Sequence, residues 1–246
     1  MRITIQFRLA SPLVLPLNYH EILQGFIYHQ MEDKAFSQFL HEKGYMYGKR
    51  SFKFFTFSRL MGRAFIDRKK KTIMFKEHVR WQVSSCLPKF IQEFGRTLLK
   101  KEDLYLSGHP VEVEELHCEP LKISQFVCTV RMLSPITVHS TYESGDGKKI
   151  TQYFSPYDPA FRHLINENLA RKYFAYYEKP LPGKIGINPV RLTKKDKVIT
   201  RFEGFVIEAW NGVYQLEGDP EALTFACTVG LGGRNSQGFG LPGLCE

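Results

Sequence analysis

The segment Gly230–Glu246, GLGGRNSQGFGLPGLCE, decides how the rest of the chain is interpreted. Two G-x-G pairs flank a polar insert, and glycine permits positive φ angles and the close approach of a ligand or of another chain segment. The residues before it predict a short helix, because Asp219 is a good N-cap and Pro220 suits a first helical turn. Gly230 then fits the C-terminal cap of that helix. Such a loop serves either to bind a phosphate or to let segments pack tightly, and both uses remain open.

A dinucleotide-binding turn is the first candidate for a G-x-G segment, and the surrounding sequence argues against it. That fingerprint requires a strand before the glycines, a helix after them and an acidic residue about 20 positions later. Here a predicted helix comes first, and too few residues follow Gly240 for a βαβ unit. No G-x-x-x-x-G-K-[ST] motif occurs either. We therefore expect no nucleotide cofactor.

Composition points to a basic protein with a substantial core. The 246 residues are 43% hydrophobic and carry a formal net charge of +9. Such a charge concentrates polyanions and favours a nucleic acid or an anionic membrane surface as partner, although charge alone also serves solubility. No apolar run is long enough to span a bilayer, and no signal peptide is visible. The five cysteines show no C-x-x-C spacing, so we expect a cytoplasmic protein without a disulfide framework or a metal site.

Periodicity predicts a βαββαβ order in the first half. Alternation in Arg2–Leu9 is typical of a half-buried strand, and Asn18 with Glu21 resembles a capping box at the start of a helix. The remaining expected elements are helical segments at 22–27 and 36–40, a strand at 52–58, a hairpin at 64–75 extended by 79–84, a helix from Ser85 or Leu87, and strands at 104–116.

The second half predicts the same order. Its expected elements are a strand at 126–138, a helix from Asp158 to Tyr173, two strands within 184–210 separated by a charged turn at 194–197, the short helix after Asp219, and a last strand. This βαββαβ order is the ferredoxin-like plan. We therefore predict an α+β protein of two tandem ferredoxin-like domains, residues 1–120 and residues 121–246, the second carrying the glycine-rich loop. Pro120 marks the expected boundary.

Four stretches resemble one known family. They are the glycine loop with its G-x-G-x₅-G-x-G spacing, LPLNYHEILQGFIY at 15–28, FLHEKGY at 39–45, and YFSPYDPAFRHLINENLARKY at 153–173. Together they resemble the CRISPR-associated endoribonucleases that cut precursor CRISPR RNA within its repeats (Cas family six). The resemblance spans nearly the whole chain, and the glycine loop is its most specific part.

The resemblance implies cleavage without a metal ion. The ribose 2′-hydroxyl attacks the adjacent phosphorus and expels the 5′-oxygen, which leaves a 2′,3′-cyclic phosphate and a 5′-hydroxyl. This chemistry needs a base, an acid and a cation near the phosphorus. By motif position the family's tyrosine, histidine and lysine fall on Tyr28, His41 and Lys53. The implied partners are CRISPR repeat RNA and subunits of a CRISPR effector complex, and a homodimer is left open.

Each candidate has a plainer interpretation. His41, near the end of a predicted helix, suits acid–base work or a simple helix cap, and His29 is its rival. Tyr28 suits a donor to the phosphate or a boundary aromatic with a wet hydroxyl. Lys53 is expected to open a strand with its stem along the core edge, and Lys49 or Arg50 could take its place.

RNA contacts are expected in the glycine loop and at two charged turns. Arg234 is the strongest candidate, because exposed backbone amides beside one arginine suit a phosphate or a stacked base. The charged turns suit solubility equally well. The expected RNA-binding residues are Gly230, Gly232, Gly233, Arg234, Asn235, Ser236, Gly238, Gly240, Arg68, Lys69, Lys70, Lys71, Lys194 and Lys195. The alternative function is a non-catalytic subunit that binds repeat RNA inside an effector complex.

Overall fold

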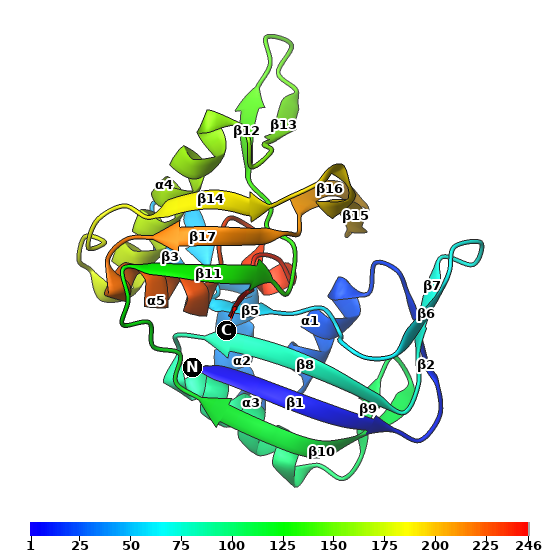
Figure 1. The fold of residues 1–246 in the computed structure, drawn as a ribbon. Helices are drawn as coiled ribbons and strands as arrows, with labels where there is room; N and C mark the ends of the chain where they lie inside the picture. The colour runs from blue at the N-terminus through cyan, green and yellow to red at the C-terminus, as the bar shows by residue number, and fades with distance from the viewer. Residues whose placement is uncertain (246) are drawn as a thin grey trace.

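The computed structural model describes residues 1–245, and two antiparallel sheets organise it (Figure 1). The N-terminal sheet has the strand order β5-β8-β1-β10-β9. Its strands are β1 (Arg2–Leu9), β5 (Phe55–Phe57), β8 (His78–Ser85), β9 (Leu104–Leu106) and β10 (His109–Glu119). The C-terminal sheet has the order β14-β17-β11-β18. Its strands are β11 (Val127–Met132), β14 (Gly186–Arg191), β17 (Val213–Glu217) and β18 (Pro242–Leu244).

Two helices cover one face of the N-terminal sheet, α1 (His20–His29) and α3 (Pro88–Lys100). Pro88 begins α3, and Phe90, Phe94 and Leu98 are buried at helical spacing. Ile3, Ile5 and Phe7 alternate along β1 and are fully buried on the same side. The apolar stripe and the strand alternation thus meet in one core, as the sequence indicated. The start of α1 differs from the expectation, because Tyr19 is its N-cap and no side chain caps it.

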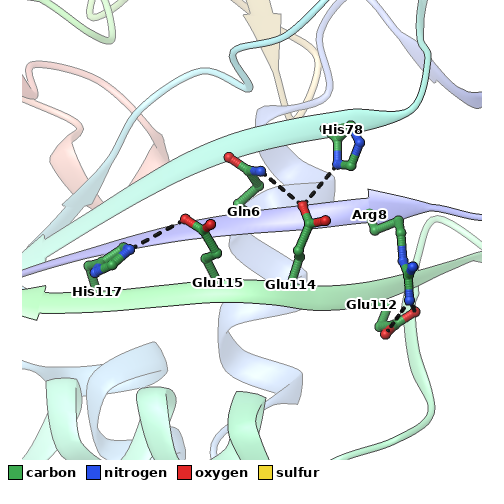
Figure 2. A network of polar contacts seen from close by, with 7 residues as sticks. All are labelled: Gln6, Arg8, His78, Glu112, Glu114, Glu115 and His117. Atoms are coloured by element: carbon green, nitrogen blue, oxygen red, sulfur yellow. Dashed lines mark hydrogen bonds and ion pairs between the residues drawn. The ribbon is translucent and has the colours of Figure 1, made fainter.

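The opposite face of the N-terminal sheet is polar (Figure 2). The pairs on it are Arg8 with Glu112 at 2.7 Å, Gln6 with Glu114 at 2.9 Å, His78 with Glu114 at 3.0 Å and His117 with Glu115 at 3.4 Å. Most of these side chains are well exposed to solvent, so each pair contributes little to stability. The stability of this sheet therefore rests on the face that the helices cover.

The segment between α1 and β8 departs most from the expected order. A helix α2 (Lys34–Gln38) runs into a π-helical turn η1 (Phe39–Lys43), and Gly44 ends it at a φ of 65°. The strand expected at 52–58 is divided into β4 (Arg50–Phe52), which pairs with β3 (Tyr45–Tyr47), and β5. Phe54, at a φ of 56°, lies between them and interrupts the extended backbone.

The hairpin at 64–75 forms as expected, but the prediction that the segment 79–84 extends its sheet is wrong. β6 (Ala64–Asp67) and β7 (Thr72–Phe75) pair with β2 (Leu13–Pro16) in a separate three-stranded sheet. The segment 79–84 belongs instead to β8, at the side of β1. Alternation alone identifies a strand but not its partner, because either neighbour buries the same apolar face.

The C-terminal half contains the expected helices, α4 (Pro159–Tyr177) and α5 (Pro220–Val229), each beginning at a proline. Its strands differ from the prediction. β15 (Lys197–Phe202) and β16 (Phe205–Trp210) pair with each other in a separate two-stranded sheet, and β14 pairs with β17, a strand that was not predicted from the sequence. A further hairpin, β12 (His139–Glu143) and β13 (Lys149–Tyr153), also escaped prediction, and the strand expected at 126–138 ends at Met132.

Polar contacts at the centre of the molecule join the two halves. The buried guanidinium of Arg2 donates to the carbonyl oxygens of Cys227 and Pro242, at 3.2 and 2.7 Å. The hydroxyl of Ser84 donates to the carbonyl oxygen of Thr228 at 2.8 Å. α5 and the C-terminal strand therefore lie against β1 and β8. None of the helices within residues 1–245 is long and apolar enough to cross a membrane.

Candidate functional site

The glycine loop is a tightly packed connection between α5 and β18. Gly230, Gly232, Gly238 and Gly240 all have positive φ angles. A Cβ atom on Gly240 would lie 2.0 Å from the carbonyl oxygen of Leu231, and one on Gly232 would lie 2.4 Å from that of Thr137. At these two positions the packing interpretation is confirmed, because backbone fills the space that a side chain would need.

A buried lysine lies inside the loop. The Lys172 ammonium, from α4, donates to the carbonyl oxygens of Gly230 and Gly232 at 2.8 and 3.0 Å, and to Oδ1 of Asn235 at 2.6 Å. Burial lowers the pKa of Lys172 to about 7, while three acceptors around one ammonium favour the protonated form. Nδ2 of Asn235 donates to the carbonyl oxygens of Leu231 and Phe239. Hydrogen bonds from the side chains of Lys172 and Asn235 therefore stabilise the conformation of the loop.

Most of the loop amides are already paired, so the expected cradle of exposed amides is wrong at those positions. The amides of Leu231, Gly233 and Gly240 donate to the carbonyl oxygens of Gly240, Thr137 and Pro135. Those of Gln237 and Gly238 donate within the loop's own short 3₁₀ turn. A ligand at this loop would therefore meet side chains, chiefly those of the half-buried insert 233–237.

The insert forms one wall of a cleft of about 390 Å³ between the two halves. The segment 50–55, after β3, forms a second wall, and η1, β12, α4 and α5 contribute the rest. The lining residues are Glu42, Arg50, Ser51, Phe52, Lys53, Phe54, Phe55, His139, Asn168, Lys172, Val229, Gly233, Arg234, Asn235, Ser236 and Gln237. The cleft therefore brings Lys53 together with Arg234, Asn235 and Ser236, which are far apart in the sequence.

Cations dominate the cleft. Arg50, Lys53, Lys172 and Arg234 line it, with Glu42 as the acidic member of the set. Lys53 is half-buried at the edge of the cleft, and this burial lowers the pKa of its ammonium. This balance suits a polyanion such as RNA.

His139 adds a neutral polar group to the same cleft. Burial, together with the positive charges of Arg234 and Arg50, lowers its pKa from 6.5 to about 4. Among residues 1–245, its Nδ1 atom finds no hydrogen-bond partner although it is buried, and the same holds for Oδ1 of Asn168 and Nε of Arg234. These three groups, all lining the cleft, leave hydrogen-bonding capacity that the protein itself does not use.

Tyr28 and His41 lie in direct contact. Their rings meet edge to face with centroids 5.0 Å apart, and Tyr28 also packs against Phe55, a residue of the cleft wall. Burial strongly raises the pKa of Tyr28, so its hydroxyl keeps its proton at neutral pH. His41 is exposed and lies in the π-helical turn, a form found frequently at functional sites.

Lys53 occupies a different position from the expected one. It lies between β4 and β5, and does not open a strand in register with Phe55. Its stem packs against Gly44, where an added Cβ would lie 2.9 Å from Cδ of Lys53. Because Gly44 ends the turn that carries His41, the fold brings Lys53 close to the segment of the other two candidates.

The two charged turns lie outside the cleft. Arg68 to Lys71 form the tip of the β6–β7 hairpin, and Lys194 and Lys195 lie in the 3₁₀ turn before β15. A contact between either turn and RNA stays a prediction. Within residues 1–245, no group of three or more His, Cys, Asp or Glu side chains is arranged to hold a metal ion.

Sequence reasoning missed His139, Asn168 and Lys172. A histidine at the start of an unpredicted hairpin carried no local signal, and a lysine on a helix usually lies in solvent. Lys172 could have been noticed, because it lies among Leu169 and Tyr173 on the apolar side of α4. A lysine there requires buried acceptors.

Comparison with known proteins decides the family. The model for the C-terminal region of the CRISPR-associated protein Cas6 matches residues 118–242, and the model for the Cas6 N-terminal region matches residues 14–117. This chain belongs to the Cas6 family. The Cas6 resemblance seen in the four sequence stretches is thereby confirmed.

Two curated Cas6 proteins are similar over nearly the full chain. The CRISPR-associated endoribonuclease Cas6 1 of Methanocaldococcus jannaschii is 30% identical, over 98% of this chain and 91% of that protein. The CRISPR-associated endoribonuclease Cas6 of Pyrococcus furiosus is 27% identical, over 92% of this chain and 82% of that protein. A solved structure described as CRISPR associated protein Cas6 superposes with a TM-score of 0.81 at 25% identity, covering 100% of this chain and 99% of that one. The mixed α/β architecture is therefore that of Cas6 proteins.

Proposed function

We propose that this protein is an endoribonuclease that cuts CRISPR repeat RNA. The observation that carries the proposal is one cationic cleft in which Lys53 faces the Arg234 insert, beside the Tyr28–His41 pair. Membership of the Cas6 family and the 30% identical relative named as an endoribonuclease support the same activity. RNA is the polyanion that fits the net charge of +9.

We also propose that the two halves are ferredoxin-like domains, residues 1–120 and 121–246. Four strands of each sheet support this. When they are numbered in chain order, both sets lie in the order second, third, first, fourth: β5-β8-β1-β10 and β14-β17-β11-β18. Helices follow the first and third strands of each set. Pro120 lies between β10 and β11, and no strand pairing within the described part of the chain joins the residues before it to those after it.

In the proposed reaction the three candidates divide the work. His41 exchanges a proton with the reacting oxygens, because its exposed imidazole can act as a general acid or base. Tyr28 donates a hydrogen bond from a hydroxyl that burial keeps protonated. Lys53 meets the negative charge that develops on the phosphorane oxygens. The 2′-oxygen forms the new bond to phosphorus, and the 5′-oxygen leaves with a proton.

The test is cleavage of repeat RNA in the presence of EDTA, followed by analysis of the product ends. We expect cutting to persist and to leave a 2′,3′-cyclic phosphate and a 5′-hydroxyl. Cutting that stops under chelation, or products with a 3′-hydroxyl, would contradict the proposed chemistry. Tight binding without any cutting would instead indicate a repeat-RNA-binding subunit of an effector complex.

A further inference from the structure

A second pocket shares the β3–β4 hairpin and α4 with the cationic cleft. It has a volume of about 530 Å³, within the range of pockets that hold small ligands. The outer surface of α4, the loop after it and one residue of β3 form its walls. The lining residues are Tyr47, His163, Asn166, Glu167, Ala170, Arg171, Phe174, Pro180, Leu181, Gly183 and Lys184.

Two aromatic rings in this second pocket are exposed to solvent. Tyr47 and Phe174 have 41% and 46% of their surface open to solvent. Their ring centroids are 5.6 Å apart at an interplanar angle of 80°, so each ring supports the other and leaves a face uncovered. Uncovered aromatic faces are the platforms on which unpaired nucleobases stack.

The hairpin connects the second pocket to the cleft. Tyr47 of β3 is paired with Arg50 of β4, and Arg50 lines the cleft. Directly opposed residues of an antiparallel pair have Cβ atoms only about 5 Å apart and point to the same face. On α4, Lys172 faces the cleft while Arg171 and Phe174 face the second pocket. The two hollows therefore share two walls.

Charge along this boundary favours a phosphodiester chain. Lys49 and Arg50 are exposed at the end of the hairpin, between the cleft and Tyr47. Lys184 and Arg171 lie around the rings, with Arg171 paired to Glu167 at 3.0 Å. A strand that leaves the cleft over Arg50 would keep its phosphates near cations while its next bases reach the rings.

We propose that the second pocket holds one unpaired nucleobase of the RNA substrate, stacked on Tyr47 and Phe174. The inference rests on the proposed function, because its ligand is the RNA bound in the cleft. The short distance across the hairpin places this base within a few nucleotides of the cleavage position. Tyr47 is thus a binding residue outside the predicted catalytic set.

The experiment combines a protein variant with a scan of the RNA. Repeat RNA carrying a 2′-deoxyribose at the mapped cleavage nucleotide allows the dissociation constant to be measured without cutting. An abasic site is placed at each nearby position in turn, and affinity is measured for the wild type, Tyr47→Ala and Phe174→Ala. Tyr47→Trp keeps a stacking surface, and Tyr105→Ala removes another exposed tyrosine, which lies outside both hollows. Thermal unfolding checks that each variant is folded.

We expect Tyr47→Ala to weaken binding of intact RNA by about 10-fold, the loss of one stacked base. One abasic position should weaken the wild type by a similar factor and Tyr47→Ala no further, while Tyr47→Trp and Tyr105→Ala bind as the wild type does. Equal losses in wild type and Tyr47→Ala at every position would overturn the inference, as would unchanged affinity in folded Tyr47→Ala and Phe174→Ala. If the wild type cuts repeat RNA and Tyr47→Ala does not change the affinity for it, only this inference is refuted. A wild type that neither binds nor cuts it refutes the proposed function as well.

Discussion

Single buried polar residues determine the shape of the cleft. Lys172 is only 3% exposed, and the three atoms that accept hydrogen bonds from its ammonium all belong to the glycine loop. His20, also buried, packs its ring 5.1 Å from that of Phe239 in the same loop. Both residues belong to helices, so the loop is held by α4 on one side and by α1 on the other.

Removing the ammonium of Lys172 should destabilise the protein. Lys172→Met keeps the length of the stem but leaves three buried acceptors without their donor, which costs about 3 kcal/mol of unfolding free energy. Urea denaturation measures the difference. Lys179→Met, at an exposed lysine just after α4, should change stability by less than about 0.5 kcal/mol. Equal effects of the two substitutions would contradict the role assigned to Lys172.

His20 should make the fold sensitive to acid. Burial, with a smaller contribution from Arg59, lowers its pKa from 6.5 to about 3, so between these values the unfolded chain binds a proton that the folded protein excludes. The contribution of His20 is therefore complete above pH 6.5 and is lost as the pH falls toward 3, at up to about 1.4 kcal/mol per pH unit. Urea denaturation of His20→Phe from pH 7 to pH 4 should show a shallower decline than the wild type. Parallel declines would contradict this assignment.

At the scale of the elements, the glycine loop depends on the space its glycines leave. Gly240→Ala would place a methyl group 2.0 Å from a carbonyl oxygen at a φ of 78°, and should cost at least about 3 kcal/mol. Gly204→Ala is the matched control, since Gly204 has a φ of 81° and no heavy atom within 4 Å of the added Cβ. It should cost only the backbone strain, about 1–2 kcal/mol. Chemical denaturation compares them, and equal losses would show that packing at Gly240 is unimportant.

Local sequence patterns were enough to predict the helices, but not every strand. Amphipathic helices such as α3, and helices that begin at Asp-Pro such as α4 and α5, carry their signal within one segment. The missed strand β17 lies in the sheet interior between β14 and β11, and its five residues carry too short a pattern to stand out. The break at Phe54 was equally invisible, because a positive φ at phenylalanine depends on tertiary packing.

Only the part of the candidate site that local motifs encode could be predicted from the sequence. Motif spacing selected Tyr28 and His41, whose rings the fold brings into contact. It could not select His139 or Asn168, because their place in the cleft depends on how the two halves meet.

At the scale of the whole molecule, the net charge of +9 should appear in the salt dependence of RNA binding. For single strands, each neutralised phosphate contributes about 0.7 to the slope of log K against log salt. Arg234→Gln should therefore make that slope shallower by about 0.7, since Arg234 lines the cleft. Binding titrations across a range of salt concentrations measure it. Lys179→Gln, which lies outside the cleft lining, should leave the slope unchanged, and an unchanged slope for both variants would place the RNA elsewhere.

We propose that residues of the N-terminal half cut RNA held in the cleft between the halves. The most direct test is the single-turnover rate of repeat-RNA cleavage by the wild type, His41→Ala and His29→Ala in EDTA, with the dissociation constant measured alongside. We expect His41→Ala to slow cleavage by about 10²–10⁴-fold with little change in affinity, because it removes a general acid–base group. His29→Ala, an exposed histidine on the same helix as Tyr28, should cut at the wild-type rate. Cleavage that persists in His41→Ala and is lost in His29→Ala would contradict the assignment.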